Sequence, residues 1–248
     1  MIVVCPKCST KNRIPDPPDT TKVYRCGKCK TELFTTSTAK ESSVEHTISH
    51  KERINSLVHI IVLSALAASD PIDKAWSKAT GEKPMSWLSN WIVRSELLFF
   101  FLHFVDSHAY AIAGPKVRDH MIDEIVPASI RGLIKSSFDG SHVKQGYDVK
   151  AWERRAMTET IEHFNDSTDR YASCKKWYSE TPGDLVHKDT VVGIMAVIIN
   201  ETAFDNHLIA EKSNWILRQL VCIAALEVLA KSGLKQQVEE ICKYILSG

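Results

Sequence analysis

Four cysteines near the N-terminus stand in two short pairs, Cys5 with Cys8 and Cys26 with Cys29, and two residues separate the members of each pair. A Cys-x-x-Cys turn presents two thiolates from one tight loop, and Zn²⁺ prefers four such soft ligands in a tetrahedron. The two pairs therefore predict one structural zinc site. An iron site of four thiolates and a pair of disulfides remain as alternatives.

The segments beside these pairs must position the thiolates. Residues 1–4, 23–25 and 32–34 are expected to form short strands, while Pro6 fixes φ in the first turn and Gly27 allows close backbone approach in the second. A module of this size cannot fold on its own apolar area. Metal binding would supply the folding free energy, on the order of 10 kcal/mol or more.

Residues 5–34, with the pattern CPKCSTKNRIP…RCGKCKTELF, resemble the N-terminal zinc ribbon of the bacterial zinc-containing thioredoxins. They are also similar to the finger-like zinc ribbons that open many bacterial proteins of unrelated function. The resemblance implies one set of metal ligands: Cys5, Cys8, Cys26 and Cys29. It covers about 30 of 248 residues, and no Trp-Cys-Gly-Pro-Cys redox motif follows, so disulfide exchange is not implied. Residues 47–248 resemble no family that we recognise.

The composition is that of a globular protein, because 44% of the residues are hydrophobic and 25% are charged. The 31 basic and 30 acidic residues leave a net charge of +1, which excludes a strong nucleic-acid or membrane field over the whole chain. Residues 1–41 nevertheless hold eight basic and four acidic residues. One Zn²⁺ with four thiolates would reduce that segment from +4 to +2. Its basic residues could contact phosphates: Lys7, Lys11, Arg13, Lys22, Arg25, Lys28 and Lys30. Asp16 and Asp19 dilute this patch, and ordinary solvation of a small module is the favoured alternative.

The chain is predicted to consist of a zinc ribbon over residues 1–34, a small-residue linker over 35–46 and an all-α domain over 47–248. Apolar spacing predicts six to eight helices in that domain, so the fold class is mainly α with short β-strands in the ribbon. A first helix from about residue 48 is expected to end at Asp70-Pro71, with a short one after it through Trp76. A long apolar helix is expected over 85–113, ending at Gly114-Pro115, with one or two short helices around Pro127 over 117–135. Further helices are expected over 148–178, 188–211, 214–231 and 234–246.

The sequence shows no secretory signal, since Met1 leads into Cys5 without a basic region or a long apolar run. No stretch reaches the roughly 18–20 apolar residues that cross a bilayer, so the apolar runs are interpreted as buried helices. We expect a cytoplasmic protein without membrane contact, in which paired cysteines bind metal rather than each other.

Polar residues interrupt two of the apolar helices. Glu96, His103 and Asp106 share one side of the 85–113 helix, and Glu201 follows the apolar run of the 188–211 helix. Buried carboxylates need partners, so the two groups are candidates for a metal or acid–base site between these helices. The alternative is a buried ion-pair or hydrogen-bond network with Arg94, Arg118 or Arg131.

Three further cysteines lie in the helical region. Cys222 and Cys242 follow apolar stripes and are interpreted as small buried side chains. Cys174 lies among basic residues that could lower its pKa, but no partner base is identifiable, so an ordinary structural role is favoured over a reactive one. No phosphate loop, H-E-x-x-H or G-x-S-x-G motif is present.

These patterns favour a non-enzymatic binding, adaptor or regulatory protein that contacts a protein or a nucleic acid through its ribbon. The alternative function is an enzyme with a site around Glu96, His103, Asp106 and Glu201. A helical oligomer whose apolar excess covers a dimer interface is a third possibility. The sequence identifies no cofactor other than one structural Zn²⁺.

Overall fold

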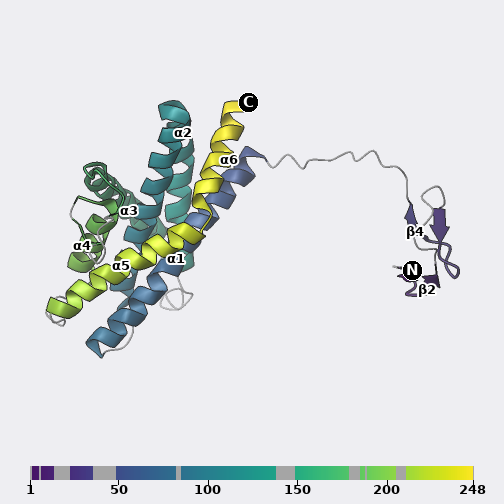
Figure 1. Cartoon of the computed structure of the whole chain (residues 1–248), viewed down its shortest axis with the longest axis horizontal. Coiled ribbons are helices and arrows are strands. Elements are labelled where there is room, and N and C mark those ends of the chain that lie inside the picture. The colour runs from purple at the N-terminus through teal and green to yellow at the C-terminus, as the bar shows by residue number, and fades with distance from the viewer. Residues whose placement is uncertain are drawn as a thin grey trace. The chain divides into compact units, whose positions relative to one another are not determined.

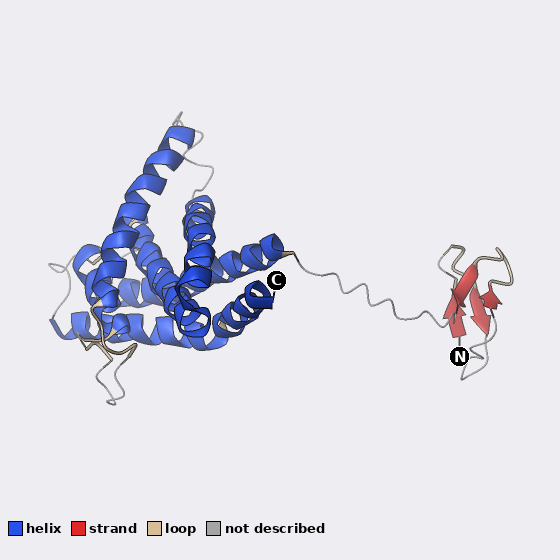
Figure 2. Ribbon diagram, turned by 90° about the horizontal axis from the view of Figure 1, so that it is seen from above, coloured by secondary structure: helices blue, strands red, loops and turns tan. Residues whose placement is uncertain are grey.

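The computed structural model describes residues 2–5, 7–13, 23–35, 49–81, 85–137, 149–178, 185–187, 189–204 and 211–247 (Figures 1 and 2). Contacts divide the chain into two compact units, Met1–Ile48 and Ser49–Gly248. Strands occur in the first unit and helices in the second (Figure 2). The mainly α fold class is confirmed, with six helices among the residues that the structure describes. The expected linker, apart from Thr35, lies outside those residues.

The N-terminal unit contains two antiparallel hairpins. Strand β1 (Ile2–Val4) pairs with β2 (Lys11–Arg13), and β3 (Val23–Arg25) pairs with β4 (Glu32–Thr35). Strand β2 was not expected from the sequence. Because each loop joins two paired strands, each Cys-x-x-Cys pair lies at the turn of its own hairpin.

Helix α1 spans His50–Thr80 and passes through Pro71, so the predicted end at Asp70-Pro71 is wrong. Ser49 and Glu52 form a capping box at its start, and Gly81 ends it in the left-handed region with φ 69°. Pro71 is exposed, and so is Ala67, whose carbonyl lacks a helical partner because proline has no N–H. Burial of Ile72 and Trp76 on the opposite side holds the last turns in place.

Helix α2 spans Trp87–Ser137 and is broken at Gly114, where φ is 74° and ψ is −177°. This backbone conformation favours glycine, and Pro115 begins the next helical segment. The predicted break at Gly114-Pro115 is therefore confirmed. The helix after it continues through Pro127 as one segment. The first half carries the centre of the core, because every side chain from Leu97 to Leu102 is buried.

The remaining helices are α3 (Val149–Ala172), α4 (Val191–Thr202), α5 (Glu211–Lys231) and α6 (Leu234–Ser247). Helix α2 contacts α1, α3, α4 and α6, so it is the central element of this unit (Figure 1). Helix α3 ends six residues before the expected position, and α4 ends at Thr202 rather than at 211. The chain after α3 forms a bridge between Lys176 and Thr190, and Thr190 then caps α4.

Two helices, α1 and α2, are long and apolar enough to cross a membrane by length and composition. This finding corrects the expectation that no such stretch exists, because the apolar character is spread over whole helices rather than over uninterrupted apolar runs. The same two helices pack against each other and supply much of the buried core. Both a membrane-spanning and a core role are compatible with their composition.

Candidate functional sites

The four N-terminal cysteines come together at the turns of the two hairpins. Cys5 Sγ lies 3.4 Å from Cys29 Sγ, and Cys8 Sγ lies 3.5 Å from Cys26 Sγ. All four sulfurs lie within 4.8 Å of one another, and none forms a disulfide. Four thiolates about 2.3 Å from a tetrahedral zinc ion would be about 3.8 Å apart. The arrangement is therefore consistent with a zinc-ribbon-like site, and the soft donor set favours zinc.

The two turns repeat the same backbone hydrogen bonds. The Cys5 N–H donates to the Thr10 carbonyl at 2.9 Å, and the Cys26 N–H donates to the Thr31 carbonyl at 2.8 Å. In each turn the residue after the second cysteine has a left-handed backbone, with φ 55° at Ser9 and 58° at Lys30. The turns are thus two copies of one geometry, Cys-x-x-Cys-x-Thr.

Each threonine hydroxyl of these turns also faces a sulfur. Thr10 Oγ1 lies 3.2 Å from Cys8 Sγ, and Thr31 Oγ1 lies 3.2 Å from Cys29 Sγ. Hydrogen bonds from Thr31 lower the pKa of the Cys29 thiol to about 6, whereas burial raises the pKa of Cys5 to about 11. Hydroxyls that donate to metal-bound thiolates spread their negative charge. This contact could have been predicted from the sequence, because Thr10 and Thr31 each stand two residues after the second cysteine of a pair.

Asn12 joins the two hairpins at the metal centre. Its Nδ2 donates to the Thr10 carbonyl at 2.8 Å and lies 3.7 Å from Cys26 Sγ, while its Oδ1 accepts from the Gly27 N–H at 3.0 Å. One side chain on β2 therefore contacts the backbone of both turns. Sequence reasoning missed Asn12, since the contact depends on how the hairpins face each other.

In the helical unit, Glu96 is 7% exposed and pairs with α3. Its carboxylate accepts hydrogen bonds from Ser167 Oγ and Tyr171 Oη, both at 3.0 Å. Burial raises the pKa of Glu96, and the two hydroxyl donors oppose that rise. The carboxylate lies at a cavity of about 490 Å³ whose lining includes Trp87 and Trp91.

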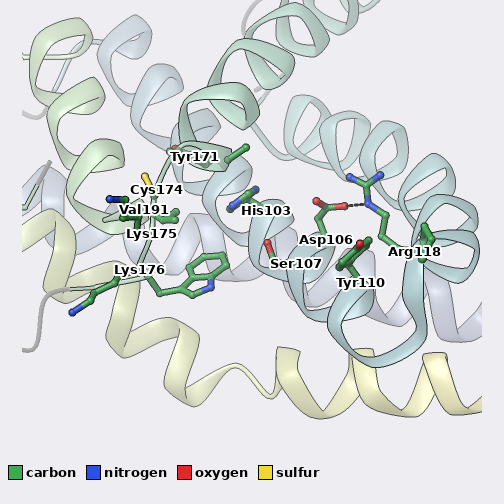
Figure 3. A pocket seen from close by; sticks show the side chains of 13 residues that line it. His103, Asp106, Ser107, Tyr110, Arg118, Tyr171, Cys174, Lys175, Lys176 and Val191 are labelled. Atoms are coloured by element: carbon green, nitrogen blue, oxygen red, sulfur yellow. Dashed lines mark hydrogen bonds and ion pairs between the residues drawn. The ribbon is translucent and has the colours of Figure 1, made fainter. Parts of the chain in front are cut away.

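His103 and Asp106 line a different cavity, of about 600 Å³, near the bend of α2 (Figure 3). The His103 ring lies 5.4 Å from Tyr171 and 5.3 Å from Trp177, measured between ring centroids. Burial lowers the pKa of His103. Asp106 forms an ion pair with Arg118 across the bend, as the ion-pair alternative expected.

The four polar residues proposed for an enzyme site are thus divided. Glu96 bonds to α3, and His103 and Asp106 face the second cavity. Glu201 is exposed and lines neither of these two cavities. The structure brings His103 and Asp106 together but not the whole set.

Among the other cysteines, Cys222 and Cys242 are buried, as predicted. Cys174 lies at the His103 cavity, half-buried, and burial raises its pKa rather than lowering it. Its basic neighbours Lys175 and Lys176 are exposed to solvent, so their charges are screened from the thiol. The expectation that basic residues lower the pKa of Cys174 is therefore wrong.

Glu96→Gln is expected to remove a loss of folding stability that the native chain shows as the pH rises. Above the ordinary carboxyl pKa of 4.5, an unfolded chain releases the Glu96 proton while the folded chain retains it. Stability contributed by the protonated group is therefore lost as the pH rises toward the raised folded pKa. The free energy of unfolding, measured with denaturant from pH 4 to 8, should fall more steeply with pH for the native chain than for Glu96→Gln.

The matched control for this measurement is Glu201→Gln, which removes an exposed carboxylate. Its stability curve should run parallel to that of the native chain. If the curve of Glu96→Gln also ran parallel to that of the native chain, burial would not raise the pKa of Glu96.

A comparison with protein-family models, curated proteins and solved structures finds no match to this chain.

Proposed function

We propose that this chain is a non-enzymatic binding protein whose zinc-loaded ribbon contacts the phosphate backbone of a nucleic acid. The observation that carries the proposal is the pair of equivalent metal-binding turns, each with an exposed lysine between its cysteines. Lys7 precedes Cys8 in the first turn, and Lys28 precedes Cys29 in the second. Because the two turns share one geometry, the two lysines occupy matching positions beside the four cysteines.

Charge supports a polyanionic partner. Besides the two turn lysines, Lys11, Arg25 and Lys30 are exposed in the described part of the ribbon. Contacts between such side chains and phosphates release counterions, and they provide affinity without base readout. A structural zinc ion would fix the two turns so that their lysines act on one surface.

A cytoplasmic location belongs to this proposal, and the burial of residues 97–102 supports its premise that α2 is a core helix rather than a membrane span. The helical unit would supply a second surface, and exposed Trp215 and Ile216 on α5 are apolar groups available to a partner or a second copy. The enzyme alternative has weaker support, because Glu96 lines one cavity, His103 and Asp106 line another, and Glu201 lines neither of the two.

The proposal is tested with a fluorescently labelled 20-nucleotide single strand, titrated with the zinc-loaded full chain at several salt concentrations. Lys7→Ala/Lys28→Ala is expected to weaken binding and to reduce the slope of log K against log salt by about 1.4, since each phosphate contact on a single strand contributes about 0.7. The control is Lys235→Ala/Lys243→Ala, which removes two exposed lysines of α6.

Binding that is unchanged in the ribbon variant, or equally reduced in the control, would contradict the proposal. An acidic peptide is titrated in parallel. Tight binding to that peptide together with none to the nucleotide strand would assign the ribbon to a protein partner instead.

A further inference from the structure

Two histidines and one glutamate form a second cluster of metal-ligating side chains, in the helical unit. His50 opens α1, while His120 and Glu124 stand four residues apart after the bend of α2. Their ligand atoms lie within 4.8 Å of one another. None of these residues belongs to the ribbon or to the two cavities described above.

Both imidazoles meet the same carboxylate oxygen. His50 Nε2 lies 3.3 Å and His120 Nε2 lies 3.5 Å from Glu124 Oε1. Ligand atoms about 2.1 Å from a tetrahedral zinc ion are about 3.4 Å apart. Both nitrogen-to-oxygen distances therefore match two edges of a coordination tetrahedron, and the two imidazole nitrogens lie within 4.8 Å of each other.

The packing of three helices fixes this arrangement. His120 and Glu124 face the same way because residues four apart share one side of a helix. The His50 ring stacks on His120 with centroids 5.4 Å apart and on Tyr244 of α6 at 6.3 Å. The Arg53 guanidinium lies over the Tyr244 ring, 4.8 Å from its centroid. The start of α1 lies beside the C-terminal part of α6 (Figure 1).

We propose that His50, His120 and Glu124 bind a second divalent metal ion, of the zinc class. Two imidazoles with one carboxylate suit zinc and its neighbours in the first transition row, rather than calcium or magnesium, which prefer oxygen ligands. Three protein ligands leave one position for water, as in catalytic zinc sites. The side chains of the cluster are 28% to 57% exposed, so the open position is accessible from solvent.

The ion would also connect two distant parts of the chain. His50 and Glu124 are separated by 74 residues and belong to different helices. Coordination would attach the first turn of α1 to α2, at the point where the chain enters the helical unit. Metal binding should therefore stabilise this unit against thermal unfolding.

Titration of the full chain with Co²⁺ separates the two sites by their ligands. Cobalt at the four cysteines gives intense thiolate charge-transfer absorption in the near ultraviolet, whereas cobalt at two histidines and a glutamate gives only weaker visible bands. The native chain is expected to bind two equivalents. His120→Ala should retain the thiolate bands and bind the second equivalent at least tenfold more weakly, since even indirect ligand changes cost this much.

Two further variants make the result decisive. Cys26→Ser/Cys29→Ser should lose the thiolate bands and keep the second equivalent, so the failure of one site is distinguishable from the failure of the other. His59→Ala removes an exposed histidine of α1 outside the cluster and should bind cobalt like the native chain. One equivalent in the native chain, or equal loss in His59→Ala and His120→Ala, would overturn the proposal.

Discussion

Replacement of Cys26 by serine is expected to abolish zinc binding at the ribbon and to unfold the Met1–Ile48 unit. Cys26 is fully buried, and its sulfur contacts both Cys8 and Asn12. Among the ribbon residues whose side-chain burial the structure describes, the buried ones are Cys5 and Cys26 themselves, so the folding of these turns depends on the metal. The loss therefore corresponds to the metal-linked folding free energy, on the order of 10 kcal/mol.

Zinc content and the amide NMR spectrum measure this loss. Cys26→Ser should contain one zinc fewer per chain than the native protein, and the amide signals of residues 2–35 should lose their dispersion. The signals of the helical unit should stay in place, because that unit is a separate body of contacts. Cys174→Ser is the matched control and should leave both readouts unchanged. Native zinc content in Cys26→Ser would show that the cysteines do not hold the metal.

The second large effect is expected in the helical core. Phe100→Ala should destabilise the Ser49–Gly248 unit by about 3–5 kcal/mol, the range for removing a large buried aromatic side chain. Phe100 is 0% exposed, and its ring packs edge-on against Phe101 at 5.3 Å and Trp177 at 5.9 Å. Little space is left for neighbours to close the resulting cavity, since residues 97–102 are buried throughout.

Denaturant unfolding followed by helical circular dichroism measures the change. Leu88→Ala lies on the same helix with 60% exposure and should alter stability by less than about 0.5 kcal/mol. A loss below about 1 kcal/mol for Phe100→Ala would contradict the interpretation of α2 as the central helix of a packed core. It would favour the alternative in which this apolar helix faces lipid.

Local chemistry explains which features were predictable. The cysteine pairs were recognised because two residues between ligands define a turn without reference to the rest of the fold. The break at Gly114 was predicted for the same reason, since glycine followed by proline interrupts a helix wherever it stands. Pro71 was misjudged because its effect depends on whether it faces water, which follows from packing.

Contacts between distant helices were not predictable. Periodicity showed that Glu96 would be buried, but its partners Ser167 and Tyr171 lie on α3, and the order of helix packing is not encoded in spacing. The same limit applies to the histidine cluster. His120 and Glu124 form a readable four-residue pair, whereas the third member is His50, 70 residues earlier in the sequence.

The division of the cysteines between two hairpins has a consequence for how the ribbon fills with metal. Each hairpin brings only two of the four sulfurs, so neither one alone completes a tetrahedron. Asn12 holds the turns in contact only once both are formed. When metal is scarce, the population should therefore divide into fully assembled and fully unassembled ribbons, with very few chains between these two states.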